Sequence, residues 1–346
     1  MWAMIAPPTT PHRPGTLVSQ LLRQRSVQIV IALWVLANVV VVVVARGRLP
    51  FDRPAVAGTP FANQLIFANL GLVEVLLLVA LTWYLTRRRQ IPDLAARAPD
   101  RDLARRETFG LIGYGVLVQV GGALLGVAFG WRPISFHLAG TIYGTHAHIT
   151  RTEAITWALY NLVLYAVVPY LFFRRRYSNE QLNLRSTDRR NDALVIVVIL
   201  VVESIVEVLT VSSAFFDLSP TQMLIGAPLA FVLYFAGTVL PTMIFIYAIL
   251  LPRFVKLTGS AVTAAILGGV AYTLAHFLDA WLVFSSASAV LLSVIFLFFQ
   301  YFGPGLIKSV LTLRTGNAWV HAIAYHSVAP HVLVDGPHVV HVFGVK

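Results

Sequence analysis

The chain has no cysteine among its 346 residues, which excludes disulfides, thiolate metal sites and a cysteine nucleophile. Charged residues are also scarce, at 12% of the chain, about half their usual share in soluble domains. The sequence contains no GxxxxGK[ST] loop, no GxGxxG after a strand-like segment and no HExxH. Nucleotide-driven transport and zincin-type proteolysis therefore lack their usual motifs.

Apolar residues, in contrast, make up 58% of the chain, and the mean hydropathy is +0.76. A soluble protein of this size has too little interior for so much apolar surface, whereas a lipid bilayer accommodates it. Only a helix satisfies its own backbone in lipid, so each long apolar run predicts a spanning helix. The sequence thus predicts an all-α, polytopic integral membrane bundle of eight or nine transmembrane helices. The nine candidate spans are 27–45, 62–86, 109–130, 152–173, 193–216, 228–251, 260–284, 287–303 and 316–334. The last is a candidate for a broken span, because it contains Pro330.

Basic residues indicate the orientation of these spans. Most of the 26 lysines and arginines lie in alternate connectors, chiefly 87–106 and 174–190, so we expect those connectors and the N-terminus to be cytoplasmic. The net charge of +11 is distributed over short loops, and we therefore expect the lipid bilayer of the cell membrane, and no nucleic acid, as the partner. Both connectors read as solvated, with anionic lipid as a secondary partner. We divide the chain into a polar cytoplasmic tail (1–26), N-terminal membrane helices (27–192), C-terminal core helices (193–334) and a C-terminal tail (335–346).

Two acids lie inside the fifth span. Glu203 and Glu207 occur in VVESIVEVL, four residues apart, and therefore share one helix face. Two carboxylates that are close together in a low dielectric do not both ionise, so the pair would hold a proton. A pair of carboxylates that holds a proton could serve as an acid–base pair, as a proton relay or as two metal ligands. The alternative is a structural pair that is hydrogen-bonded to neighbouring helices. Glu74, mid-span in LGLVEVLLL, is a further candidate for a proton-coupled role or for a bond to a nearby asparagine.

Histidines occur in the last spans. His276 and Asp279 lie three apart in AYTLAHFLDAW, where the carboxylate can orient the imidazole; the alternative is a histidine satisfied by the backbone or a hydroxyl group. His321, His326 and His331 follow at steps of five, which rotate by about 140° on an α-helix, so at most two should face one site. His146 and His148 lie in an expected outer loop and suggest at most adventitious metal binding.

The C-terminal third resembles the CPBP intramembrane proteases, the family of CAAX prenyl proteases and bacteriocin-processing proteins. The family's FxxxH motif corresponds to Tyr272–His276, with tyrosine for phenylalanine. Its HxxxN motif is approached by GNAWVHAIAYHSVAP, where His326 is the histidine and His331 follows the position of the asparagine. The paired-glutamate EExxxR motif is missing. Its glutamates fall on Thr242 and Met243 of TMIFIYAILLPRF, its arginine falls on Tyr247, and no glutamate follows Glu207.

The resemblance implies an intramembrane endopeptidase acting on a membrane-associated peptide, or a catalytically degenerate relative. In the family the glutamates activate water, and the histidines assist or hold a metal. Here Glu203 and Glu207 are the candidate replacements, together with His276 and His326 as catalytic residues. A divalent metal such as zinc would then be held by His276 and His326, with Asp279 and His331 nearby. The alternative is a non-enzymatic scaffold or a transporter that reuses the fold.

Overall fold

The computed structural model describes residues 19–346, which include no β-strand. Seven helical stretches in this range are long and apolar enough to cross a membrane. They are α2 (Arg25–Ala45), α3 (Phe61–Leu85), α5 (Arg101–Phe129), Arg151–Arg174, α8 (Arg189–Thr210), Pro220–Thr258 and α14 (Ala287–Thr315). The predicted all-helical class is therefore confirmed. Most of the predicted N-terminal tail, residues 1–18, lies outside the described residues.

Two of the long stretches include π-helical segments. Arg151–Arg174 consists of α6 (Arg151–Asn161), the π-helix η2 (Leu162–Val167) and α7 (Val168–Arg174). Pro220–Thr258 consists of α10 (Pro220–Tyr234), η3 (Phe235–Val239), α11 (Leu240–Thr242), η4 (Met243–Leu250) and α12 (Leu251–Thr258). A π-helix has one residue more per hydrogen-bonded turn than an α-helix and occurs often at functional sites.

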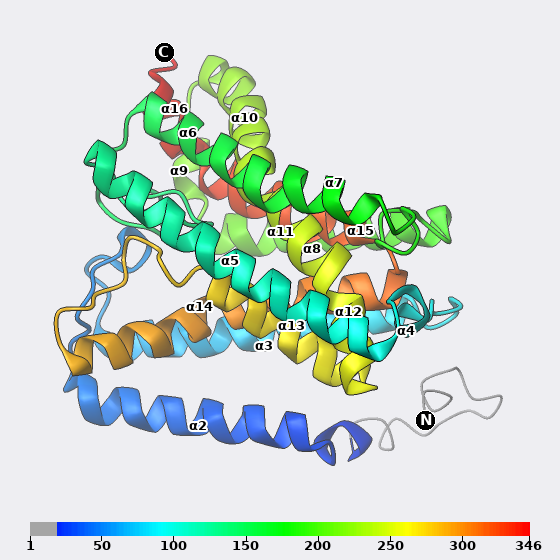
Figure 1. Cartoon of the computed structure of the whole chain (residues 1–346). Helices are drawn as coiled ribbons and strands as arrows, with labels where there is room; N and C mark the ends of the chain where they lie inside the picture. Colours follow the sequence, from blue (N-terminus) through cyan, green and yellow to red (C-terminus); the bar gives the residue numbers. More distant parts are fainter. Residues whose placement is uncertain (1–18) are drawn as a thin grey trace.

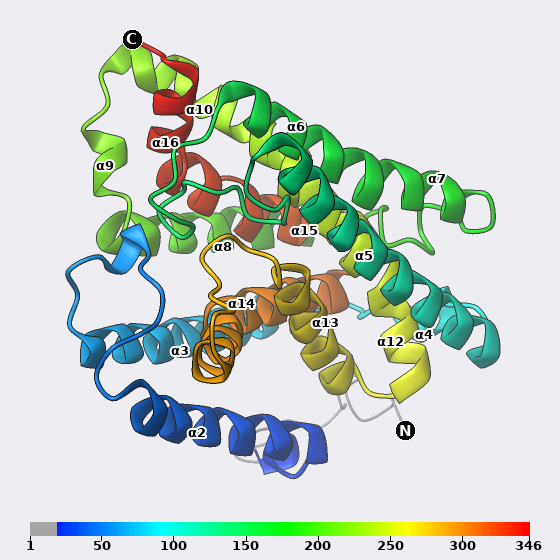
Figure 2. The same cartoon turned by 60° about the vertical axis from the view of Figure 1, so that its left-hand side comes forward.

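The outward faces of the helices are apolar. On α2, Leu33 is 59% exposed and Val43 is 66% exposed. This helix lies along one edge of the bundle in both views (Figure 1, Figure 2). Exposure of such a continuous apolar surface is unfavourable in water but not in lipid. The apolar outward faces and the lengths of the helices therefore both indicate membrane-spanning helices.

The connectors alternate between two ends of the bundle (Figure 1). Segments 46–60, 130–150 and 276–286 lie at one end, which we call the 130–150 end. Segments 86–100 and 175–188 lie at the opposite end, which we call the 175–188 end. This arrangement brings segments far apart in the sequence, 130–150 and 276–286, to the same end of the molecule.

Many residues of 87–107 and 174–192 are exposed, in agreement with the expectation of solvated connectors, but two arginines of the first connector are buried and anchor it in the protein. Arg89 pairs with Asp192 on α8 and donates to the carbonyl oxygen of Thr315 at 2.6 Å. Arg97, at the end of α4 (Leu94–Arg97), donates to the carbonyl oxygen of Gly316, also at 2.6 Å. Thr315 and Gly316 form the C-terminal end of α14. The last carbonyl groups of a helix have no partner within the helix, so the two arginines cap α14.

Helix α13 (Ala261–Ala275) packs closely against α14, because glycines face each other where they meet. A Cβ atom on Gly305 would lie 2.9 Å from Cα of Gly269 and 2.7 Å from Cβ of Tyr272. The lack of side chains at this crossing allows the close approach, and it places Tyr272 against α14.

The C-terminal spans differ from the predicted ranges. Helix α14 continues through Pro304 to Thr315, so Lys308 lies within the bundle and not in a cytoplasmic connector. Helix α13 ends at Ala275, well before the predicted limit of 284. The predicted last span is broken into α15 (Ala318–His321) and the π-helices η5 (Ala322–Ser327) and η6 (Ala329–Val334). The predicted C-terminal tail contains a further helix, α16 (Gly336–Phe343).

Candidate functional site

A buried histidine–aspartate pair lies directly after α13. Nδ1 of His276 is 3.1 Å from Oδ2 of Asp279, and both side chains are almost completely buried. The pairing agrees with the predicted orientation of the imidazole by the carboxylate. The hydroxyl of Tyr301, on α14, donates to Oδ2 of Asp279 at 2.5 Å, and the hydroxyl of Ser135 donates to Oδ1. The carboxylate therefore accepts from three side chains, which fix its position.

Ser135 belongs to the 130–150 segment, which was expected to be an outer loop. Trp157 and Asn161 of α6 both donate to its backbone carbonyl, at 2.7 and 2.9 Å. These bonds hold the irregular segment inside the bundle, where Phe136 and Leu138 are buried. Non-helical backbone is tolerated at such a place because protein groups satisfy it.

The ring of His276 is enclosed, but one of its polar atoms lacks a partner. Its imidazole stacks on Tyr301, and Nδ1 faces Asp279. Nε2 is buried and has no hydrogen-bond partner among the described residues. A buried ring nitrogen costs free energy unless it is bonded, so this atom is where a water molecule or a substrate group would bind.

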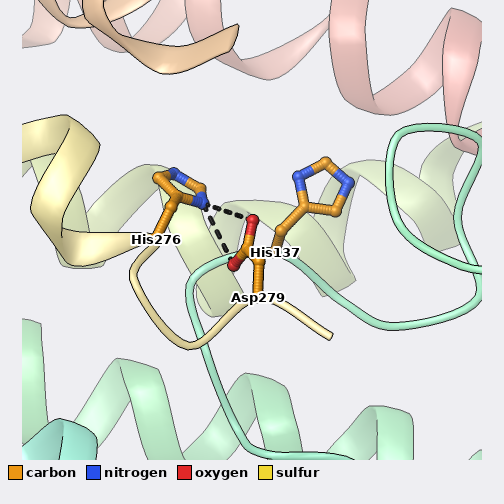
Figure 3. Close-up of side chains that lie close together, drawn as sticks. All are labelled: His137, His276 and Asp279. Carbon is orange, nitrogen blue, oxygen red and sulfur yellow. Dashed lines mark hydrogen bonds and ion pairs between the residues drawn. The ribbon is translucent and has the colours of Figure 1, made fainter. Parts of the chain in front are cut away.

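His137, which sequence reasoning did not single out, completes a group of three possible metal ligands. One donor atom from each of His137, His276 and Asp279 lies within 4.8 Å of the other two. Figure 3 shows the three side chains converging, with one ring nitrogen of His137 turned toward the other two. His137 lies in SFHLAG, a stretch without helical periodicity, and the only available signal was an isolated histidine in a segment rich in apolar residues.

The environment of His137 keeps its imidazole neutral. Loss of hydration inside the protein lowers the pKa of His137 to about 4, although the edge of the ring remains partly exposed. Nε2 of His137 lies 2.7 Å from the hydroxyl of Thr141, which itself donates to the carbonyl oxygen of Leu138. When Thr141 donates to Leu138, its oxygen accepts from Nε2–H, and the lone pair of the ring is then on Nδ1.

His326 lies near this group but is not one of the three ligands. Its Nε2 is 3.3 Å from the hydroxyl of Tyr272, and its Nδ1 is 3.3 Å from the hydroxyl of Thr242. Tyr272 also contacts His276, with ring centroids 4.9 Å apart. The tyrosine thus links the two histidines that were predicted to be catalytic. The predicted metal pair of His276 and His326 stays a prediction, whereas His276 shares a group of three possible ligands with His137 and Asp279.

His326, at the end of η5, and His331, in η6, lie together across the bend at Val328. Their ring centroids are 5.3 Å apart, although a step of five on an α-helix would turn them away from each other. The backbone between them departs from the α-helix, so the α-helical rotation does not apply across this break. His331 also stacks on Tyr234 and pairs with Asp335 at 2.9 Å. His321 instead lies beside Thr312 and Tyr247, so two of the three histidines share a site, within the limit that the sequence set.

Glu203 and Glu207 belong to a second polar group beside the histidines. Glu203 is buried and interacts electrostatically with Glu74, Glu207 and Lys308. Glu207 is partly buried and interacts with Glu74, Asp335 and Tyr143. The structure thus assembles Glu74 with the predicted glutamate pair, and this acidic group is distinct from the group around His276.

Lys308 joins the two groups and was missed because it appeared to follow the end of a span. It is 1% exposed, and its ammonium lies 3.7 Å from the ring centroid of Tyr272. An aromatic face attracts a cation, most strongly when water is excluded. A lysine on a helix with apolar residues both before and after it was the signal in the sequence.

The chain matches no known protein-family model, no curated protein and no solved structure.

Proposed function

We propose that the protein is an intramembrane hydrolase that cleaves peptide bonds of membrane-associated peptides, with its reaction centre at His276 and Asp279. The observation that carries the proposal is the buried pair itself. A carboxylate orients one nitrogen of an imidazole, while the other nitrogen is left without a partner among the described residues. An oriented histidine with one nitrogen available is the arrangement that general acid–base catalysis requires.

In this proposal the His276–Asp279 pair activates a water molecule bound at Nε2. The water oxygen forms a bond to the carbonyl carbon of the peptide, and the bond from that carbon to nitrogen breaks. The proton taken from the water passes to the leaving amine. Asp279 stabilises the imidazolium that forms in between, because its carboxylate lies beside Nδ1.

His326 and Tyr272 serve in this proposal as donors to the carbonyl oxygen of the substrate. The hydroxyl and the imidazole are already within hydrogen-bond distance of each other, next to His276. Donors that are positioned before the reaction stabilise the negative charge that develops on that oxygen. We therefore give the acid–base role to His276 and Asp279, and not to Glu203 and Glu207, whose electrostatic partners are Glu74, Lys308 and Tyr143.

The resemblance to CPBP proteases remains part of the proposal. The three stretches that correspond to the family's motifs contact one another here: Thr242 and Tyr272 both lie 3.3 Å from a ring nitrogen of His326. This contact supports a shared architecture. Thr242 stands where the family has a glutamate, so the His276–Asp279 pair would supply the base that the motif lacks.

We further propose the orientation and the number of spans. The N-terminus is cytoplasmic, the chain lies in the cell membrane, and α13 with the α15–η6 segment brings the number of crossings to eight or nine. The support is the concentration of arginines at the 175–188 end, since basic connectors remain on the cytoplasmic side.

The experiment maps new N-termini in membranes from cells that produce the wild type or a variant. We expect cleavage sites in or beside apolar segments with the wild type, and none of these with His276→Ala. His341→Ala is the matched control, because His341 is an exposed histidine on α16. Identical N-termini in all three samples would contradict the proposal.

A second candidate function, proton-coupled transport, is favoured by the acidic group alone. Glu74, Glu203 and Glu207 come from two helices and interact with one another inside the bundle. Ionisable groups within spans are costly and often mark proton paths. Liposomes carrying the protein and a pH-sensitive dye distinguish the two functions: transport requires a proton flux that Glu203→Gln removes, whereas hydrolysis requires none.

A further inference from the structure

The strongest unassigned feature is the convergence of three ligand-type side chains from two segments that are far apart in the sequence. His137 comes from the 130–150 segment, and His276 and Asp279 come from the turn that follows α13. Nδ1 of His276 and Oδ2 of Asp279 are 3.1 Å apart. Two ligands of a tetrahedral zinc ion with bonds of about 2.1 Å lie about 3.4 Å apart, so this pair already has nearly the required separation.

His137 is prepared as a metal ligand by its hydrogen bond to Thr141. In the tautomer that carries the proton on Nε2, the ring donates this bond to Thr141 and leaves the lone pair of Nδ1 available for a metal. Metal-bound histidines generally donate their other N–H group in this way, which fixes both the tautomer and the direction of the ring. In Figure 3 the free side of the ring faces His276 and Asp279.

Asp279 is supported in the same manner. Ser135 and Tyr301 each donate a hydroxyl to one of its two oxygens. Carboxylate ligands in metal sites are normally held by such outer hydrogen bonds. His137 is partly exposed, whereas His276 and Asp279 are buried.

We propose that His137, His276 and Asp279 bind one divalent transition-metal ion, with zinc as the best match. Two imidazoles and one carboxylate suit zinc rather than magnesium or calcium, which prefer oxygen ligands. Three protein ligands leave a fourth position open, as in catalytic rather than structural zinc sites. The ion would replace the proton between His276 and Asp279, and the remaining ligand distances of up to 4.8 Å would contract around it.

The use of this ion in catalysis rests on the proposed function, whereas its binding does not. Zinc supplies a coordinated water with a pKa of about 7. With the ion at Nδ1, His276 would serve as a ligand and not as the base, so His276→Ala should abolish hydrolysis with or without the metal.

The test uses the full chain, purified in detergent, stripped with a chelator and titrated with zinc chloride. We expect one zinc per chain by calorimetry and by elemental analysis. His137→Ala and Asp279→Asn should each weaken binding at least 100-fold. Thr141→Val, which removes only the bond to His137, should weaken it about 10- to 100-fold.

The matched control is the double variant His148→Ala/His341→Ala. These histidines have ring centroids 6.2 Å apart and would account for adventitious zinc. Retention of one zinc by this variant supports the proposed site. Loss of zinc here but not in His137→Ala would overturn the proposal, and so would a wild type that binds none.

The outcomes for the metal and for the hydrolase are distinguishable. If the protein binds zinc but cleaves no peptide, the metal site is supported and the proposed function is contradicted. Cleavage that persists in the stripped protein contradicts the use of the ion in catalysis and leaves the proposed function standing; the zinc titration, not the cleavage, decides whether the site binds metal. Tetrahedral cobalt absorption in the wild type, absent from His137→Gln at equal thermal stability, gives a second readout without activity.

Discussion

The imidazole of His276 stacks on the phenol ring of Tyr301, with centroids 3.8 Å apart and ring planes inclined by 9°. The same tyrosine donates its hydroxyl to Asp279. One side chain of α14 therefore holds both members of the proposed reaction centre, the first through its ring and the second through its hydroxyl.

Tyr301→Phe should separate these two contributions. The substitution keeps the stacked ring and removes a buried hydrogen bond to a carboxylate, which should lower the free energy of unfolding by about 1.5–3 kcal/mol. Unfolding by denaturant in detergent micelles measures the change. Tyr84→Phe is the control, because Tyr84 is exposed on α3 and should lose almost nothing. Equal losses in both variants would show that the hydroxyl of Tyr301 does not hold Asp279.

Lys308→Met should destabilise the bundle by about 3 kcal/mol or more, because it leaves the buried Glu203 without its positive neighbour. Glu203→Gln in the same chain should recover part of the loss, with a coupling energy above about 1 kcal/mol. A double-mutant cycle in detergent measures the coupling. Lys256→Met, at the end of α12, should have a much smaller effect. Additive losses for Lys308 and Glu203 would contradict their interaction.

Glu107→Gln should cost about 3–5 kcal/mol of stability, because it removes the charge opposite a buried arginine. Arg253 is 2% exposed and contacts Oε2 of Glu107 at 2.6 Å. Asp102→Asn tests the exposed pair with Arg105 on the same helix, which should contribute no measurable stability. The midpoint of thermal unfolding compares the two variants. Similar shifts would mean that the buried ion pair does not join α5 to α12.

The orientation of the chain can be tested with reporter fusions. Fusions after residues 100 and 185 should report the cytoplasm, because the arginine-rich connectors remain on that side. A fusion after residue 58, in the connector between α2 and α3, should report the opposite side. A cytoplasmic signal at residue 58 or an outer signal at residue 100 would reverse the proposed topology.

Much of the fold could be predicted because lipid imposes a simple rule on the sequence. Seven of the predicted ranges correspond to helices long enough to span, from 27–45 to 287–303. The predicted end at 303 was wrong, because α14 continues through Pro304 to Thr315. The predicted end at 284 was also wrong. The sequence stays apolar up to residue 284, but the helix ends at Ala275 and the chain continues from His276 as an irregular turn that forms the site.

The candidate site was only partly predictable, because tertiary contacts define it. The pairing of His276 with Asp279 follows from their spacing. The nearness of His326 to His331 depends on the break between two π-helices, for which the sequence has no periodic signal. His137 enters through a segment held by Trp157 and Asn161, and no local pattern in the sequence predicts that contact.

The most direct test of the proposed reaction is the incorporation of oxygen from water. The purified protein, in lipid nanodiscs prepared in ¹⁸O-water, is incubated with a pool of membrane-spanning peptides, and the new carboxyl termini are analysed by mass spectrometry. Hydrolysis at the His276–Asp279 centre predicts ¹⁸O-labelled termini from the wild type and none from His276→Ala at comparable thermal stability. Equal labelling by both proteins, or no labelled product from the wild type, would contradict it.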